Sequence, residues 1–134
     1  MGGGDLKDEI AGVEFLKATG YVDPNKIGIT GGSYGGFMTL MAIGKTPEIW
    51  RAAVEEYGII DWSSMLKSSD PSLNEYLKSL LGDPEAQQVV KILKKEGRTV
   101  DVHYYANEGH GFVKRENQID AIRRTIAWFE RRQE

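Results

Sequence analysis

The stretch KIGITGGSYGG, residues 26–36, carries the signals that decide the fold. Residues 26–30 alternate and are rich enough in β-branched side chains to predict a short strand. A glycine-rich turn follows directly, and the apolar run at residues 37–43 predicts a helix after it. A strand, G-x-S-x-G and a helix in this order indicate a nucleophile elbow, a turn tight enough to need glycine around the serine. Ser33 is then the predicted nucleophile, and the Tyr34 backbone N–H the predicted oxyanion donor. The alternative is a glycine-rich turn that contains a serine by chance.

Composition limits the classes of function that the chain can have. It has 134 residues, 40% of them hydrophobic and 28% charged, with a net charge of −3. These values predict one soluble domain over residues 1–134 and give no reason to expect nucleic acid or an anionic membrane as partner. The chain contains no cysteine, and we expect neither a metal nor a cofactor. Because the sequence shows no secretory leader and no apolar run of roughly 18 residues, we expect a cytoplasmic protein.

Helical and strand patterns alternate along the rest of the chain. Asp5 is the expected cap of a first helix that ends at Gly20, and the helix after the elbow is expected to end at Gly44. Residues 51–60 are typical of a second strand, so that a parallel βαβ unit surrounds the elbow. This alternation predicts an α/β layer fold with about three mostly parallel strands flanked by helices. The further expected elements are helices at 73–81, at 85–96 with Gly97 as stop and at 117–131, and a third strand at 99–105.

Two of these helices have a predicted buried face. The first helix repeats apolar residues at helical spacing, and so does the last. The side chains expected to be buried are Leu6, Ile10, Val13 and Leu16 or Lys17 in the first helix, and Ile119, Ile122, Ile126 and Phe129 in the last.

A serine nucleophile needs a base, and the chain has two histidines. His103 lies within the predicted third strand, where a structural role is expected. His110 lies in a glycine-flanked loop just after that strand, from which a side chain can reach the carboxyl edge of a parallel sheet. The order serine, then histidine, is also that of α/β-hydrolases. We therefore predict His110 as the general base.

The segment VDPNKI, residues 22–27, which leads into GGSYGG, and NEGHGF, residues 107–112, resemble the prolyl oligopeptidase family. The resemblance covers essentially the whole chain and is strongest to the acylaminoacyl-peptidase and dipeptidyl-peptidase-like branch. It implies a shortened α/β-hydrolase fold with Ser33 as nucleophile, His110 as base and the Tyr34 N–H as one oxyanion donor.

The chain also departs from the family pattern. The upstream strands and β-propeller of the family are absent from this sequence, and one of those segments carries the second oxyanion donor. The strand that ends in the catalytic aspartate is missing between the helices at 73–81 and 85–96, as if an internal segment were deleted at residues 82–85.

The sequence consequently leaves the identity of the triad acid open among three candidates. Asp83 is the first candidate, because it precedes the helix at 85–96 and falls between Ser33 and His110 in the chain. An aspartate before a proline is also an ordinary helix N-cap. Glu108 and Asp61 are the fallbacks, with a solvated loop carboxylate as the alternative for Glu108.

These features suggest a serine hydrolase that forms an acyl-enzyme with short-chain carboxylic esters and retains some peptidase activity. The alternatives are a catalytically inactive remnant of a peptidase and a module that binds anions at the helix N-terminus. Because three strands leave an open sheet edge, we also expect a homodimer or higher homo-oligomer. The tryptophans add to the apolar surface that such an assembly would cover: Trp50, Trp62 and Trp128.

Overall fold

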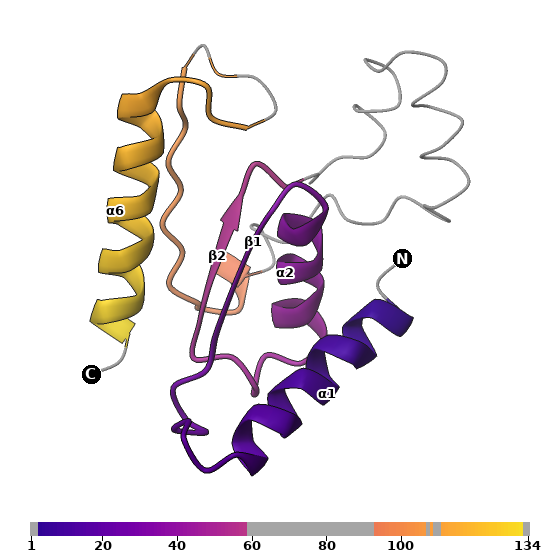
Figure 1. Ribbon diagram of the computed structural model, residues 1–134. Coiled ribbons are helices and arrows are strands. Elements are labelled where there is room, and N and C mark those ends of the chain that lie inside the picture. Colours follow the sequence, from indigo (N-terminus) through magenta and orange to yellow (C-terminus); the bar gives the residue numbers. More distant parts are fainter. Residues whose placement is uncertain (1–2, 59–92, 107, 109–110, 133–134) are drawn as a thin grey trace. The chain divides into compact units, whose positions relative to one another are not determined.

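A computed structural model describes residues 3–58, 93–106, 108 and 111–132 (Figure 1). Contacts divide the chain into two units, residues 59–103 with residue 1 and residues 2–58 with 104–134. The second of these units contains the labelled elements: α1 (Gly4–Ala18), β1 (Gly28–Gly32), α2 (Tyr34–Lys45), β2 (Ala52–Glu56) and α6 (Arg115–Arg132).

The centre of this unit is the βαβ arrangement that the sequence predicts. β1 and β2 pair in parallel, from Gly28 opposite Ala52 to Gly32 opposite Glu56. The first strand therefore lies two residues further along than the expected 26–30, because backbone pairing with β2 continues through both glycines to the elbow. The described residues form a two-stranded sheet, with α2 packed against both strands, α1 against α2 and α6 against β2.

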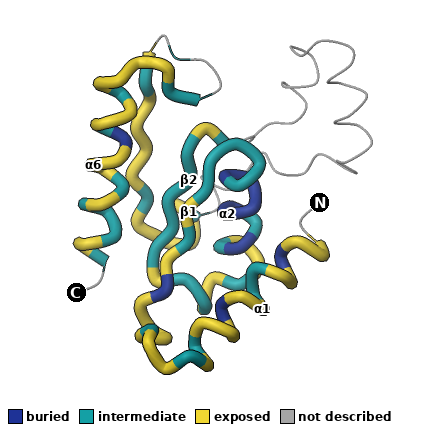
Figure 2. The backbone as a smooth tube through the Cα atoms, in the orientation of Figure 1, coloured by how far each residue is buried: buried dark blue, intermediate teal, exposed yellow. Residues whose placement is uncertain are grey.

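α2 carries most of the buried core (Figure 2). Its one buried hydroxyl, on Thr39, donates to the carbonyl of Gly35 at 2.9 Å, so the polar group has a partner inside the core. Gly44, the expected stop, lies inside the helix, which ends at Lys45. The buried residues of α2 are Gly36, Phe37, Met38, Thr39, Leu40 and Ala42.

α1 confirms the expected end but not the expected start. Gly20 has a φ of +72° and follows the helix C-terminus, as a glycine stop requires. The N-cap is Gly3 rather than Asp5, and no side chain caps the helix. Asp5 lies in the first turn instead, where its carboxylate accepts a hydrogen bond from the Tyr34 hydroxyl. Of the predicted face, Leu6 and Val13 are buried.

α6 overturns the expected burial of the last helix. Its buried residue is Ala121, whereas Ile119, Ile122 and Ile126 are 41%, 58% and 53% exposed. The helix meets the sheet through Phe129, whose ring lies so close to Gly28 that a Cβ there would be 2.5 Å from the ring carbon Cε1. The helix therefore packs on the sheet through Phe129 and through polar side chains such as Thr125, and its three isoleucines stay exposed.

Residues 93–103 are the described part of the other unit. Residues 93–95 are helical, and the helix ends at Gly97, as predicted. Gly97 has a φ of +70°, and the Arg98 N–H donates to the Leu93 carbonyl at 2.9 Å, which together form a Schellman end. Residues 99–105 are irregular, so the predicted third strand is wrong. A strand exists only through a pairing partner, and alternation in the sequence does not supply one.

No helix in the described part of the chain is long and apolar enough to cross a membrane.

Candidate active site

Ser33 occupies the turn between β1 and α2 in a strained backbone conformation. Its φ is +55° and its ψ is −121°, a combination that residues other than glycine rarely adopt. The Ser33 N–H donates to the Glu56 carbonyl at 3.1 Å, and the Ser33 carbonyl accepts from the Phe37 N–H at 3.1 Å. One bond therefore fixes the serine to the end of β2 and the other starts α2. This is the backbone geometry of a nucleophile elbow.

Close backbone approaches explain why glycines surround the serine. A Cβ on Gly31 would collide with the backbone carbonyl of Gly35, across the turn. A Cβ on Gly36 would lie 2.7 Å from the Cα of Gly58, the residue that leads the chain away from β2. Side chains at positions 31 and 36 would push the first turn of α2 away from the strands, so both glycines maintain the tight elbow.

Tyr34 begins α2, and its side chain reaches back to α1. Its hydroxyl donates to the Asp5 carboxylate, and its ring stacks on Phe37 with centroids 5.9 Å apart. Burial, followed by the hydrogen bond and charge of Asp5, raises the pKa of Tyr34 to about 12. The phenol therefore stays protonated at physiological pH. The Tyr34 N–H belongs to the first turn of α2, where the backbone donors have no intrahelical acceptor, as an oxyanion donor requires.

The turn after β2 places an aromatic ring beside the elbow. The Glu55 carboxylate accepts a hydrogen bond from the Gly58 N–H and so closes the turn around Tyr57, which has a φ of +40°. Burial raises the pKa of the Glu55 carboxyl, although the Gly58 hydrogen bond opposes this shift. The Tyr57 ring covers Gly32, where a Cβ would lie 2.7 Å from the phenol oxygen.

Glu108 anchors the loop of the predicted base. Its two carboxylate oxygens accept hydrogen bonds from the Val113 N–H at 2.9 Å, the Lys114 N–H at 3.1 Å and the Asn117 amide at 2.5 Å. The Val113 hydrogen bond is the largest cause of a lowered Glu108 pKa. These bonds favour a structural carboxylate that ties the loop to the start of α6, rather than the solvated carboxylate or the triad acid.

Phe112 packs the end of the same loop against the elbow. Its ring makes edge contacts with Tyr57, at 5.4 Å between centroids, and with Tyr105, at 4.9 Å. Its carbonyl accepts from the Gln118 side-chain amide at 2.8 Å. Because Tyr57 also lies against Gly32, a continuous row of contacts joins the loop after His110 to the residue before Ser33.

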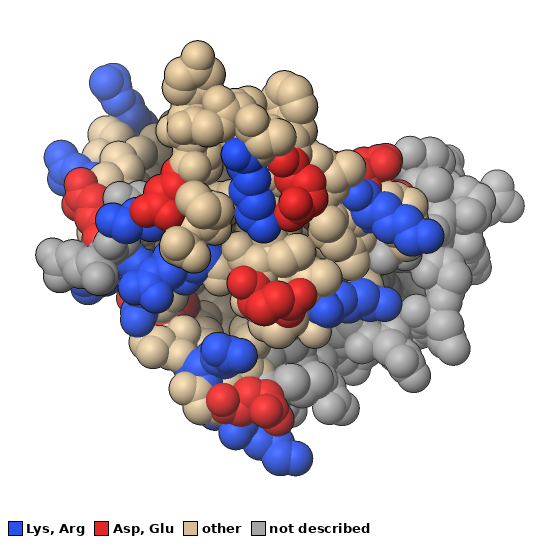
Figure 3. Space-filling view, turned by 90° about the horizontal axis from the view of Figure 1, so that it is seen from below, with Lys and Arg blue, Asp and Glu red and all other residues tan. Residues whose placement is uncertain are grey.

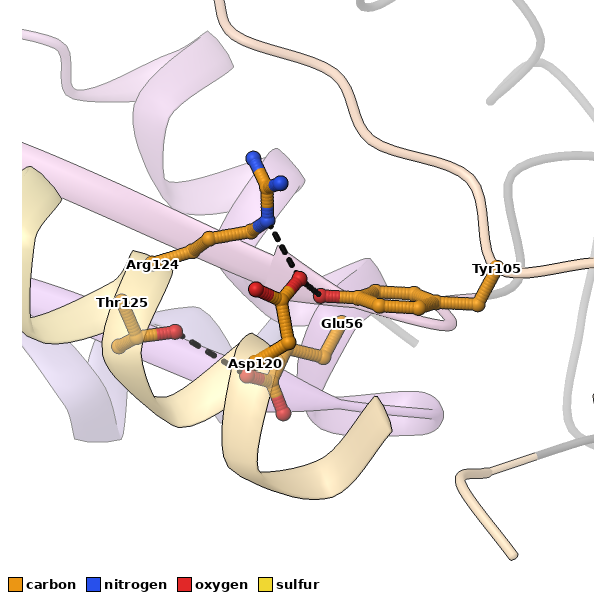
Figure 4. A network of polar contacts seen from close by, with 5 residues as sticks. All are labelled: Glu56, Tyr105, Asp120, Arg124 and Thr125. Carbon is orange, nitrogen blue, oxygen red and sulfur yellow. Dashed lines mark hydrogen bonds and ion pairs between the residues drawn. The ribbon is translucent and has the colours of Figure 1, made fainter. Parts of the chain in front are cut away.

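A polar network joins α6 to the end of β2 (Figure 4). The Tyr105 hydroxyl donates to Asp120 at 2.7 Å, and Arg124 binds the same carboxylate oxygen at 2.6 Å. The Thr125 hydroxyl donates to the Glu56 carboxylate at 3.2 Å. Since the Glu56 backbone carbonyl also accepts from Ser33, α6 contacts the residue that holds the elbow.

Ser33 lies in the turn before α2 and Tyr34 is the first residue of that helix, while their catalytic roles stay predictions. The candidate base and two candidate acids lie outside the described residues: His110, Asp83 and Asp61. His103 is described and lies in an exposed irregular segment rather than in a strand. Among the described residues, no group of three or more carboxylates and histidines could hold a metal ion.

Sequence reasoning missed the residues that support the elbow from β2 and from the loop. Glu55 and Glu56 lie at the carboxyl end of β2, where functional groups gather. The strand predicted at 51–60 put them in its middle and Asp61 at its end, so the prediction gave no signal for them. The sequence places Tyr57 and Phe112 near the predicted site, but their contact had no signal, because it depends on a fold that brings residues 57 and 112 together.

The sequence is similar to that of several curated proteins. The uncharacterized peptidase YuxL of Bacillus subtilis is 43% identical over 70 residues, which are 52% of this chain and 10% of that protein. A putative carboxymethylenebutenolidase of Aquifex aeolicus is 29% identical over 124 residues, 88% of this chain and 54% of that protein. An acylamino-acid-releasing enzyme of Arabidopsis thaliana is 23% identical over 173 positions, 96% of this chain and 23% of that enzyme. The chain thus spans from a tenth to about half of these relatives' lengths.

The family model of the prolyl oligopeptidase family matches residues 1–88 and 84–133. Its two matched stretches overlap at residues 84–88, and this overlap includes the end of the segment 82–85 where the sequence predicts an internal deletion. The alignment with the Arabidopsis enzyme extends over 173 positions and is therefore longer than this 134-residue chain. The first match contains the strained turn at Ser33, and the two matches together cover residues 1–133, so the chain belongs to the prolyl oligopeptidase family of serine hydrolases.

Proposed function

We propose that this chain is a serine hydrolase that cleaves short-chain carboxylic esters through an acyl-enzyme, with residual activity on peptides. The observation that carries the proposal is the backbone of Ser33, held at a φ of +55° between β1 and α2. Strain of this kind persists where the surrounding structure enforces it, and it is concentrated at functional sites.

The proposed reaction uses four groups of the chain. The Ser33 hydroxyl oxygen attacks the ester carbonyl carbon while His110 accepts the hydroxyl proton, and the Tyr34 N–H stabilises the oxyanion. The carbon–oxygen bond to the leaving group then breaks, and the alcohol departs with the proton from His110. Water, deprotonated by His110, attacks the acyl-serine and releases the acid. Asp83 is the proposed partner that orients His110.

Esters are favoured over amides for a chemical reason. An alcohol leaves more easily than an amine, so ester cleavage tolerates a weaker oxyanion site, and Tyr34 supplies one donor. A relative named as a putative carboxymethylenebutenolidase supports this preference, because a butenolide is a cyclic ester. Relatives named as a peptidase and as an acylamino-acid-releasing enzyme support the residual activity on peptides.

Covalent labelling with a fluorophosphonate tests the proposal. We expect one adduct per chain by intact mass, placed on Ser33 by peptide mapping and absent in Ser33→Ala. Protein unfolded in urea is the control, because labelling of an activated serine requires the folded elbow. An unlabelled but folded wild type would reject catalysis and favour the alternative, a folded remnant of a serine peptidase.

Single substitutions then identify the acid. Asp83→Asn should lower kcat steeply if Asp83 orients His110, since the loss of an orienting carboxylate in such a triad costs up to about 10⁴-fold. Glu108→Gln and Asp61→Asn serve as matched comparisons. A larger loss in either comparison than in Asp83→Asn would transfer the role of the acid to that residue.

A further inference from the structure

Asp5 and Tyr34 join the first turn of α1 to the first turn of α2. The Tyr34 hydroxyl donates to the Asp5 carboxylate, although the two residues lie 29 positions apart in the chain. A hydrogen bond to an ionised carboxylate is stronger than one between neutral groups. Leu6, the next residue of α1, is 6% exposed, so this turn is packed against the protein. The phenol of Tyr34 is therefore bound to a second, packed helix.

Phe37 connects the Tyr34 ring to the backbone of the elbow. Its own ring is buried and stacks on the Tyr34 ring, with centroids 5.9 Å apart and an interplanar angle of 27°. Its N–H donates to the Ser33 carbonyl at 3.1 Å. One buried residue thus contacts both the Tyr34 side chain and the peptide unit that precedes Tyr34.

That peptide unit also carries the Tyr34 N–H. A peptide unit is planar, so the direction of its carbonyl fixes the direction of its N–H. The hydrogen bond from the Phe37 N–H to the Ser33 carbonyl therefore sets the direction of the Tyr34 N–H. Direction matters because a donor stabilises an oxyanion only when it is aimed at the place where the charge develops.

We propose that Asp5 is a positioning residue: by binding the Tyr34 phenol, it holds the Tyr34 ring on Phe37 and keeps the Tyr34 N–H in the direction that an oxyanion donor needs. This inference rests on the proposed function, in which that N–H stabilises the oxyanion. Asp5 acts through Tyr34 and Phe37 and contacts no reacting atom. The loss of an oxyanion donor lowers kcat by about 100- to 1000-fold, and a donor that is only displaced retains part of its effect.

Tyr34→Phe tests the role of the hydrogen bond, because it removes the hydroxyl and keeps the ring that stacks on Phe37. We expect kcat on a p-nitrophenyl ester to fall about 10-fold with KM nearly unchanged, and phosphonate labelling of Ser33 to slow by the same factor. Asp5→Ala should lower kcat at least as far. Asp5→Asn should retain most of the activity, because the amide oxygen still accepts the phenol proton. Asp8→Ala removes an exposed carboxylate from the same helix and is the matched control, with wild-type kcat expected.

A double-mutant cycle separates this contact from the rest of the surroundings of Asp5. Asp5 has a further interaction, which Asp5→Ala removes as well. The variant that combines Asp5→Ala with Tyr34→Phe should lose no more kcat than Asp5→Ala alone, because the contact between the two side chains is already gone. A further loss of about 10-fold in the combined variant would overturn the positioning role, since the two side chains would then act independently. Wild-type kcat in Tyr34→Phe, or a raised KM with kcat unchanged, would also overturn it.

Amide hydrogen exchange at residues 34–37 supplies a readout that needs no turnover. Tyr34→Phe and Asp5→Ala should speed exchange there, whereas Asp8→Ala should not. Unchanged exchange in the first two variants would overturn the inference, whatever their kcat. A wild type that does not label contradicts the proposed function, and the exchange measurement then decides by itself whether Asp5 holds the elbow backbone. Circular dichroism shows whether each variant is folded, and Tyr34→Phe and Asp5→Asn carry the test if Asp5→Ala does not fold.

Discussion

Ser33 shows how one residue can oppose the stability of the fold. Its φ of +55° and ψ of −121° are a conformation that costs a non-glycine residue about 1–3 kcal/mol. The neighbours that enforce it are the Glu56 carbonyl, which accepts the Ser33 N–H, and the first turn of α2. The free energy of unfolding should therefore rise when the strain is removed.

Ser33→Gly tests this directly. Glycine tolerates the elbow conformation, and after subtraction of its larger unfolded-state entropy we expect a gain of about 1 kcal/mol in unfolding free energy. Urea unfolding followed by circular dichroism measures the gain, and all ester hydrolysis should be lost. Ser33→Ala is the matched control, since it abolishes hydrolysis without relieving the backbone. Equal stability of the two variants would contradict strain at this position.

Glu55 predicts a pH dependence with a definite sign. Burial raises its pKa in the folded state above the value of 4.5, so the folded protein resists ionisation of this carboxyl. Ionising Glu55 in the folded state lowers the free energy of unfolding. This loss is absent below the pKa of Glu55 in the unfolded chain, grows as the pH rises above that value, and is complete above the pKa in the folded protein. Glu55→Gln keeps an oxygen acceptor for the Gly58 N–H and removes this loss.

Glu55→Gln should accordingly be more stable than wild type at pH 7 by up to about 1 kcal/mol, a value limited by solvent screening. The difference should shrink toward pH 4, as measured by thermal unfolding across that range. The exposed Glu48→Gln controls for the change in net charge. A difference that is constant with pH, or that grows in acid, would show that Glu55 is stabilised by being ionised.

At this scale the motif predicts the nucleophile and the glycines, because G-x-S-x-G specifies local backbone geometry. It does not predict that Tyr34 binds Asp5, or that Tyr57 covers Gly32. Those contacts join residues 25 or more positions apart, so they depend on how α1 and β2 pack rather than on local pattern.

At the scale of the elements, the start of α6 is held by hydrogen bonds to Glu108 in the segment before it. Glu108 accepts the Val113 and Lys114 N–H groups just ahead of the helix and the Asn117 side-chain amide in its first turn, which ties Glu108 to the helix start. The charge of Glu108 also lies at the positive end of the helix dipole. Removing the carboxylate should loosen both the start of α6 and the loop before it.

Glu108→Ala should lower the melting temperature and speed amide exchange at Val113 and Lys114. Hydrogen bonding lowers the pKa of Glu108 in the folded protein. The ionised carboxylate therefore stabilises the fold above the pKa that it has in the unfolded chain, and this stabilisation is lost as the pH falls through the pKa in the folded protein. The gap in melting temperature between wild type and Glu108→Gln should therefore close below about pH 4. Glu116→Gln, on an exposed residue of the same helix, is the control. A gap that widens in acid would contradict the assigned hydrogen bonds.

Two errors at the element scale have a common cause. The isoleucine stripe of α6 and the alternation at residues 99–105 are real periodicities, and each predicts a buried face. Periodicity identifies a face that can be buried, but a neighbouring element has to be present to bury it. Local signals succeeded only in part: the glycine stops at Gly20 and Gly97 are confirmed, whereas the cap at Asp5 and the stop at Gly44 are wrong.

At the scale of the whole molecule, the surface charges give no sign of a nucleic-acid partner, whereas the exposed apolar residues indicate a protein partner. Acidic and basic side chains are interspersed on the face shown in Figure 3, so that face has no single-sign field to attract nucleic acid. The stripe of α6, by contrast, exposes three isoleucines at helical spacing. Such a stripe is typical of a surface that another protein surface covers.

We expect a homodimer or higher homo-oligomer in solution. Light scattering at micromolar concentration should give at least twice the monomer mass, and the melting temperature should rise with protein concentration. Ile122→Lys should shift the mass toward the monomer, because it places a charge in the middle of the exposed stripe. Lys7→Ala, on an exposed residue of α1, is the control. A monomer mass at all concentrations would reject the assembly.

The contacts that hold the Ser33 backbone all lie within one short segment of the chain. β1, α2, β2 and the turn at Glu55–Gly58 form one continuous segment of 28–58, and within it lie the glycine contacts and the Glu56 bond that strain Ser33. The point where the two family matches meet, residues 84–88, is outside this segment. A deletion at that point would leave the whole segment 28–58 in place. We therefore expect that residues 28–58, grafted into a related sheet, would keep the backbone conformation of Ser33.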